Sequence, residues 1–142
     1  LEFAPITFLT ALEHRNTHAA LDVARSLFKQ AHTRVSTGRI NKAIEEAVRK
    51  RKPPAGTTGT ILNLYYGTQV AVDPPTLTLF VNQPEAVSEE YARYLVHRFR
   101  ETLPFSEVPL RLLFRASRGK GDEVAMTRKK PATKGHARRK RL

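Results

Sequence analysis

Apolar residues recur at helical spacing in two stretches of the chain. In residues 37–51 they fall three or four positions apart and define one helix face: Ile40, Ala43, Ile44, Ala47 and Val48. In residues 89–103 the corresponding positions are Ala92, Leu95, Phe99 and Leu103. Ser36 and Ser88 stand where N-caps are expected, and Pro53 and Pro54 end the first pattern. The sequence therefore predicts two amphipathic helices.

Three other stretches alternate apolar and polar residues, as strands with one face on a core do. In residues 60–72 the predicted core face is Leu62, Leu64, Tyr66, Val70 and Val72, and the opposite face is Ile61, Asn63, Tyr65 and Gln69. Residues 76–82 place Leu77, Leu79 and Val81 inward and Thr78 and Phe80 outward. Residues 110–114 place Leu110, Leu112 and Phe114 inward, and Arg111, Leu113 and Arg115 outward.

The order of these elements predicts an α+β domain. The connection through Asp73, Pro74 and Pro75 is so short that the first two strands should be antiparallel neighbours. From residue 36 onward the order is α-β-β-α-β, which indicates a three-stranded sheet with its helices on one face. Ahead of this domain, residues 6–9 are expected to form a short buried strand and residues 17–33 a helix.

Charge is distributed unevenly along the chain. The 142 residues carry 25 Lys and Arg against 13 Asp and Glu, a net charge of +12. Ten basic and only two acidic residues follow Ala116, where the apolar periodicity also ends. Such a tail is expected to be disordered until it meets a polyanion, and nucleic acid is favoured over membrane because the tail has no apolar face.

The basic residues fall into two candidate nucleic-acid-binding groups. One lies on and just after the first helix: Arg39, Lys42, Arg49, Lys50, Arg51 and Lys52. The other lies in the tail: Arg128, Lys129, Lys130, Lys134, Arg138, Arg139, Lys140 and Arg141. A solvated charge run remains the alternative for the helical group, whereas the tail carries more charge than solubility requires.

The outer face of the sheet is a further candidate surface. Tyr65, Phe80 and Leu113 should gather there, flanked by Arg111 and Arg115. Aromatic rings edged with arginine can stack unpaired bases, and the same surface could instead dock a neighbouring domain.

The composition excludes several classes of protein and site. There is no cysteine, hence neither disulfides nor thiolate metal sites. No apolar run approaches the roughly 20 residues of a membrane span, and residues 1–12 do not read as a signal peptide, so a soluble cytoplasmic protein is expected. His14 and His18 are four residues apart but have no third ligand nearby, so no metal site is predicted.

A series of short motifs gives the chain a specific resemblance. In order they are residues 34–38 (RVSTG), Asn41, Pro53-Pro54, residues 64–69 (LYYGTQ), Pro74-Pro75, residues 79–82 (LFVN), and Tyr91 with Tyr94-Leu95. Together they resemble the C-terminal KH-like domain of the Der (EngA) family, whose members are tandem-G-domain GTPases that assist assembly of the large ribosomal subunit. The resemblance covers roughly residues 1–116.

The resemblance implies three parts. Residues 1–33 would be the last strand and helix of a G domain, with Thr10 and Ala11 as a remnant of the guanine-contacting motif. Residues 34–116 would be the KH-like domain, and residues 117–142 a disordered basic tail. After Ala11 the chain departs from the family's usual Leu-Thr-Gly-Gln-Gly-like turn and reads LEHRN at residues 12–16.

The same resemblance implies a non-catalytic module. The chain has no G-x-x-x-x-G-K-[ST] phosphate loop and no Asn-Lys-x-Asp motif, so it holds no cofactor of its own, and GTP and magnesium would belong to the missing G domains. Residues 56–59 read G-x-x-G but lead into a strand rather than joining two helices, so they are interpreted as a connector.

Two functions remain open. In the first, the domain binds ribosomal RNA of the large subunit and docks on the G domains of the same protein. In the second, it is a purely structural and regulatory domain that locks the G domains, and only the basic tail touches RNA. Because Der-type proteins pack the KH-like domain against the G domains, the resemblance favours docking for the outer sheet face.

Overall fold

The computed structural model describes residues 3–55, 59 and 61–117. Within these residues the elements occur in the following order: α1 (Thr17–Ala31), α2 (Thr37–Lys50), β1 (Leu64–Ala71), β2 (Thr76–Val81), the 3-10 turn η1 (Pro84–Ala86), α3 (Glu89–Thr102) and β3 (Arg111–Ala116). The predicted α-β-β-α-β order is confirmed.

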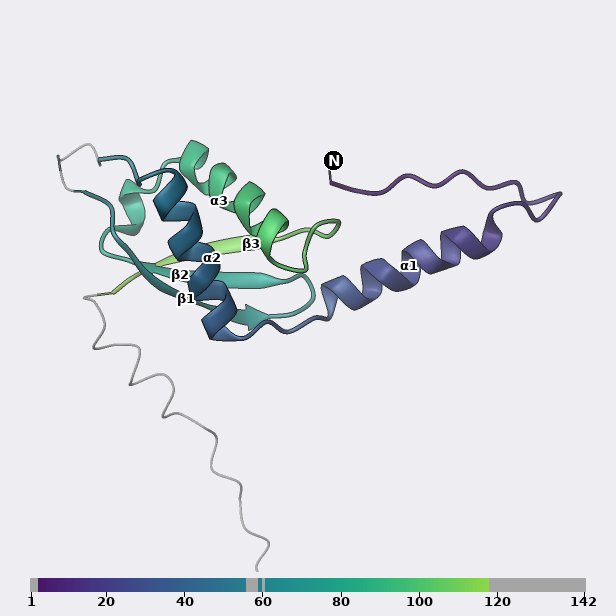
Figure 1. Cartoon of the computed structure of the whole chain (residues 1–142), viewed down its shortest axis with the longest axis horizontal. Coiled ribbons are helices and arrows are strands. Elements are labelled where there is room, and N and C mark those ends of the chain that lie inside the picture. Colours follow the sequence, from purple (N-terminus) through teal and green to yellow (C-terminus); the bar gives the residue numbers. More distant parts are fainter. Residues whose placement is uncertain (1–2, 56–58, 60, 118–142) are drawn as a thin grey trace, which may run out of the picture.

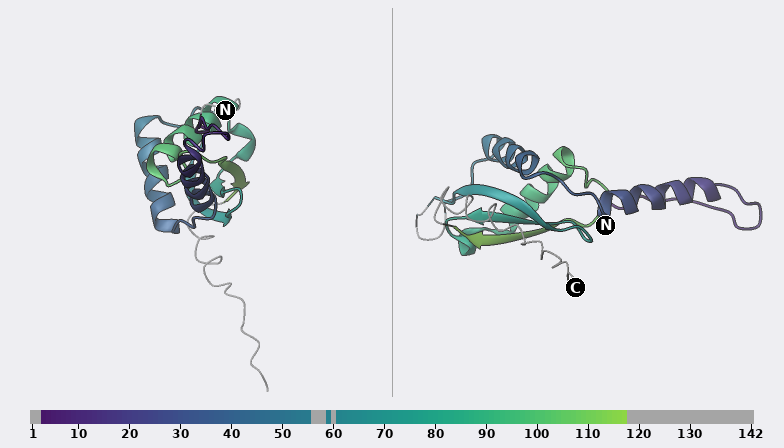
Figure 2. Two further views of the ribbon diagram at one scale, coloured as in Figure 1. Left: turned by 90° about the vertical axis from the view of Figure 1, so that its right-hand side faces the viewer. Right: turned by 90° about the horizontal axis from the view of Figure 1, so that it is seen from below.

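The strands form a mixed sheet in the order β1-β2-β3. β1 pairs antiparallel with β2, as the short connection predicts, and β2 pairs parallel with β3. Helices α2 and α3 lie on the same side of this sheet, whereas α1 projects away from it (Figures 1 and 2). The predicted two-layer architecture is therefore confirmed.

Both predicted N-caps are confirmed. The Ser36 hydroxyl accepts from the Arg39 amide at the start of α2, and the Ser88 hydroxyl accepts from the Tyr91 amide at the start of α3. Each cap satisfies one backbone donor that the first helical turn leaves without a partner.

The core fills the space between the two helices and the inner sheet face. Its fully buried members include Ile40 and Ala47 of α2, Leu77 and Leu79 of β2, and Leu95 and Phe99 of α3. Tyr91 and Phe105 are also buried, which the helical and strand patterns did not indicate.

The side chains of β1 do not all point to the faces that were predicted. A register shift between Leu64 and Tyr66 adds one residue to β1, and the side chains from Tyr66 to Gln69 change face; a second shift follows between Gln69 and Ala71. Tyr66 therefore lies opposite Phe80 on the outer face, while Gly67 pairs with Leu79 on the core face. Gln69, expected on the outside, is buried instead.

Gln69 anchors the segment that leads into α2. Its Oε1 accepts from the Val35 amide at 2.7 Å, and its Nε2 donates to the carbonyl oxygens of Thr33 at 3.0 Å and Ala71 at 3.1 Å. A buried amide is tolerated here because its oxygen and nitrogen both have partners.

The prediction of a buried strand at residues 6–9 is wrong. These residues form no strand, and Ile6 and Phe8 are each 81% exposed. A strand needs a neighbour to pair its backbone, and the described part of the chain offers this segment none beyond an isolated bridge between Thr10 and Arg15.

Candidate nucleic-acid interface

The exposed side of α2 carries several basic side chains. Arg39, Lys42, Arg49 and Lys50 of the helix and Lys52 just after it are all exposed. None of these five takes part in an ion pair within the described residues. The last of them lie at the C-terminal end of α2, where the helix dipole favours cations.

Arg51, predicted with this group, makes a structural contact instead. Its guanidinium lies 2.6 Å from the Glu90 carboxylate and 5.4 Å from the centre of the Tyr94 ring. The hydrogen bond to Glu90 raises the pKa of Arg51, and the same bond lowers the pKa of Glu90. Arg51 therefore joins the end of α2 to α3, and its charge is partly neutralised by Glu90.

A small hollow separates α2 from the end of α3. It has a volume of about 310 Å³ and is lined by Arg39, Lys42, Ala43, Glu46 and Thr102. Two cations and a threonine hydroxyl around one hollow suit a phosphate group, whereas the negative charge of Glu46 would repel it.

The outer sheet face does not offer the expected aromatic platform. Tyr66 and Phe80 stack with centroids 4.5 Å apart, and they are only 4% and 5% exposed. Tyr65, predicted here, lies instead on the helix side, because the register shift turns it toward α2. Leu113 is exposed on this face, and the exposed Arg111 and Arg115 flank it in the sequence. A base could not stack on rings that already cover one another.

Tyr65 lines a groove between α2 and the edge strand β1. The groove has a volume of about 280 Å³ and is lined by Asn41, Ile44, Glu45, Val48, Arg49, Leu64 and Tyr65. The sequence patterns did not predict this groove. The one signal for it was Asn41, a polar residue beside the apolar stripe of α2, whose side chain bonds to the Gly67 amide of β1.

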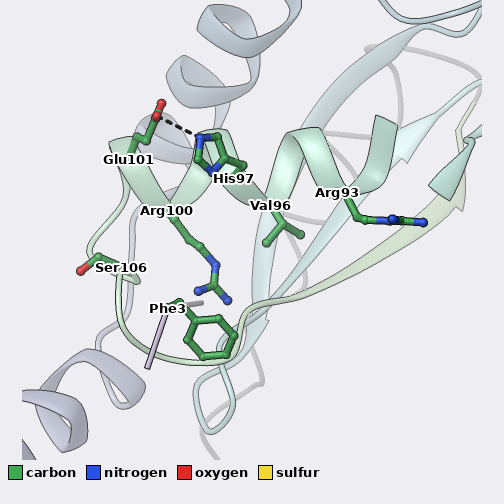
Figure 3. Close-up of a pocket in the computed structure, with 7 residues that line it drawn as sticks. All are labelled: Phe3, Arg93, Val96, His97, Arg100, Glu101 and Ser106. Carbon is green, nitrogen blue, oxygen red and sulfur yellow. Dashed lines mark ion pairs between the residues drawn. The ribbon is translucent and has the colours of Figure 1, made fainter. Parts of the chain in front are cut away.

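A larger cavity of about 650 Å³ lies where the first described residues meet α3 (Figure 3). The Arg100 guanidinium lies 3.7 Å from the centre of the Phe3 ring, and burial lowers the pKa of Arg100. His97 pairs with Glu101 at 3.3 Å on the same helix. Phe3 thus contacts α3.

The predicted nucleotide-contact remnant forms an exposed turn. Thr10 and Ala11 are exposed, and the Thr10 amide donates to the Arg15 carbonyl at 3.2 Å. Among the described residues, no group of three or more His, Cys, Asp or Glu side chains could hold a metal ion, and no helix is long and apolar enough to cross a bilayer.

Two sets of predictions lie outside the described residues. They are most of the G-x-x-G sequence, residues 56–58, and the tail cations Arg128, Lys129, Lys130, Lys134, Arg138, Arg139, Lys140 and Arg141. Their proposed roles stay predictions.

Comparison with known proteins gives one consistent result. Residues 34–115 match the family described as KH-domain-like of EngA bacterial GTPase enzymes, C-terminal. The chain is 42% identical to GTPase Der of Syntrophobacter fumaroxidans over 115 residues, which cover 81% of this chain and 26% of that protein. It is 41% identical to GTPase Der of Rhodopirellula baltica over 112 residues, 79% of this chain and 24% of that protein.

A third relative extends the match slightly. GTPase Der of Desulforapulum autotrophicum is 43% identical over 122 residues, 86% of this chain and 25% of that protein. The chain thus spans about a quarter of the length of these relatives. It belongs to the GTPase Der (EngA) family, and residues 34–115 are the KH-like domain found at the C-terminal end of those proteins.

Proposed function

We propose that this chain is the non-catalytic RNA-binding and domain-docking module of a Der-type GTPase, acting in the cytoplasm during assembly of the large ribosomal subunit. The RNA-binding part is carried by the exposed cations on and after α2 that form no ion pair within the described part of the chain. Phosphate contacts by Lys and Arg supply most of the sequence-independent affinity for RNA.

The docking part rests on the contacts between residues 3–33 and the KH-like domain. Phe3 lies against Arg100, and Gln30 bonds to Glu107 with its Nε2 2.6 Å from the carboxylate. If residues 1–33 are the end of a G domain, these contacts would fix the orientation of the KH-like domain relative to that G domain.

These docking contacts also favour the alternative function. In it, the KH-like domain only locks the G domains, and RNA touches the tail alone. The two functions differ in whether the α2 cations contribute to RNA affinity.

A matched pair of variants separates them. Arg39→Gln with Lys42→Gln removes two α2 charges, and Lys29→Gln with Arg34→Gln removes two exposed charges outside α2 that make no ion pair within the described residues. Titrating both with fragments of large-subunit ribosomal RNA at several salt concentrations measures the slope of log affinity against log salt. We expect the α2 variant to lower that slope by roughly 1.4 to 1.8 and the control to change it little. Equal slopes in the two variants would favour the alternative.

The module is expected to lack catalysis on its own. Because the chain contains no phosphate-loop motif, we expect purified protein incubated with GTP and magnesium to release no phosphate above background. Saturable turnover in a phosphate-release assay would contradict this.

A further inference from the structure

The groove between α2 and β1 combines an apolar floor with a polar rim. Ile44, Val48 and Leu64 form the floor. Asn41, Glu45 and Arg49 line it at four-residue intervals along α2, so they share one face of the helix. Tyr65 supplies an aromatic ring that is 38% exposed. The groove is therefore open to solvent and has directional polar groups beside a flat apolar surface.

Asn41 is held in place by a hydrogen bond, and all three polar groups of the rim are available to a ligand. Asn41 Oδ1 accepts from the Gly67 amide at 2.8 Å, which orients the side chain and leaves its Nδ2 donor without a hydrogen bond among the described residues. Glu45 and Arg49 take part in no ion pair there. The rim thus presents one donor, one acceptor and one cation in a row.

A β-strand from a protein partner fits this edge poorly. β1 is an edge strand, and an added strand needs its outward backbone groups. The Gly67 amide in the middle of β1 already donates to Asn41 Oδ1. An added strand therefore could not accept a hydrogen bond from it, and the strand pairing would be interrupted there.

A nucleobase fits the same groove better. It is flat, its edge carries both donors and acceptors, and it is attached to phosphate. We propose that the groove binds one unpaired base of single-stranded RNA. The base would stack on Tyr65, bond through its edge to Asn41 Nδ2 and the Glu45 carboxylate, and place a flanking phosphate near Arg49.

This inference rests on the proposed RNA-binding function and adds a specific site to it. The carboxylate of Glu45 accepts hydrogen bonds only, so it favours bases with an exocyclic amino group, namely adenine, cytosine and guanine, over uracil. The net charge of +12 supplies the general attraction for RNA, while the groove supplies the stacking.

The test compares Tyr65→Ala and Tyr65→Phe in the full chain, with Leu113→Ala as the control. Leu113 is 43% exposed, close to the exposure of Tyr65, but lies in β3, on the opposite edge strand. Affinity is measured by fluorescence anisotropy with labelled ten-nucleotide adenosine and uridine RNAs and with duplex RNA of the same length. Thermal unfolding confirms that each variant is folded.

We expect Tyr65→Ala to weaken adenosine-RNA binding by roughly 5- to 140-fold, with little change in the salt slope. Tyr65→Phe and Leu113→Ala should bind the adenosine RNA about as tightly as the unsubstituted chain. Tyr65→Ala should change the affinity for duplex RNA little. Ultraviolet crosslinking of the unsubstituted protein to the adenosine RNA should place the crosslink at Tyr65, a readout that depends on no variant.

Other outcomes overturn the inference. RNA binding that Tyr65→Ala leaves intact would remove the groove site but keep the proposed function. An equal loss in Leu113→Ala would assign the effect to general destabilisation or to the sheet face. Absence of RNA binding by the unsubstituted chain at low salt would overturn the proposed function itself, and the groove site with it.

Discussion

At the scale of single residues, Gly67 controls how closely α2 packs on the sheet. A Cβ atom at this position would lie 2.7 Å from Leu79 Cδ2 and 2.9 Å from Ile44 Cδ1, both within the buried core. Contacts that short require side chains or backbone to move. The register shift before Gly67 places the residue without a side chain where the helix comes closest.

Gly67→Ala should therefore lower the free energy of unfolding by about 1–3 kcal/mol, the usual cost of overpacking a core. Gly38→Ala is the control, because Gly38 lies in the first turn of α2 with nothing within 4 Å of a built Cβ. It should be neutral or stabilising by up to about 1 kcal/mol. Urea denaturation measures both, and equal midpoints for the two variants would show that the contact at Gly67 relaxes freely.

A second residue-scale prediction concerns Tyr91. This side chain is 1% exposed, and burial raises its pKa from 10.0 to about 12. In the unfolded chain the phenol ionises near pH 10, whereas in the folded chain it stays neutral to about pH 12. Its contribution to stability is therefore complete below pH 10 and is lost as the pH rises from 10 to 12.

Denaturant titrations between pH 8 and 12 test this dependence. The protein should lose stability over the upper part of that range, and Tyr91→Phe should remove part of the loss. Tyr91→Phe also deletes the hydrogen bond from the phenol to the Arg51 carbonyl, so its stability below pH 10 provides the baseline. Parallel curves for both proteins would mean that other groups cause the alkaline loss.

At the scale of elements, α1 is attached to the rest of the fold near its C-terminal end, where Leu27 and Ala31 pack against the core and Gln30 makes polar contacts. None of its residues is fully buried. Gln30 bonds with both ends of its amide: Nε2 donates to the Glu107 carboxylate, and Oε1 accepts from the Glu107 amide at 3.1 Å. Gln30 thus adds polar contacts to the packing of Leu27 and Ala31 against the core.

Gln30→Ala should loosen α1 while leaving α2 unchanged. Loss of about 1–2 kcal/mol of hydrogen bonding would speed amide hydrogen exchange in α1 roughly 5- to 30-fold. Lys29→Ala is the matched control, because Lys29 is exposed in the same helical turn and makes no ion pair among the described residues. Exchange rates that rise equally in both variants, or in neither, would contradict this role for Gln30.

Elements were predictable from the sequence where their causes are local. The caps at Ser36 and Ser88 and the apolar stripe of α2 depend on residues within a few positions of each other, and the structure confirms them. The register shift in β1 brings Gly67 against Ile44, 23 positions away in sequence, and this contact is not local. Alternation alone could not reveal it, so Tyr65 and Tyr66 were assigned to the wrong faces, and the groove was missed with them.

The strand predicted at residues 6–9 failed for a different reason. Its apolar residues indicate a buried segment, and Ile6 is nevertheless 81% exposed. A strand forms only with a partner to complete its hydrogen bonds. Within the described part of the chain, residues 6–9 have no such partner.

At the scale of the whole molecule, the positive charge is divided between the folded part of the chain (the body) and the residues after Ser117 (the tail). Of the 25 Lys and Arg residues, ten follow Ser117, together with only two acidic residues. General attraction for RNA should therefore come mainly from the tail, while the body contributes shape and the α2 cations. The two contributions respond differently to salt, because each neutralised phosphate adds to the slope of log affinity against log salt.

Deleting residues 118–142 should isolate the two contributions. The truncation keeps Ser117, whose amide donates to the Val81 carbonyl at 2.8 Å and extends the pairing of β3 with β2. If the tail makes about five phosphate contacts, the salt slope for single-stranded RNA should fall by roughly 3.5 to 4.5. The effect of Tyr65→Ala on the remaining affinity should persist in the truncated chain, because stacking in the groove does not require the tail. A truncated protein with an unchanged slope would instead place the phosphate contacts on α2 and its neighbours.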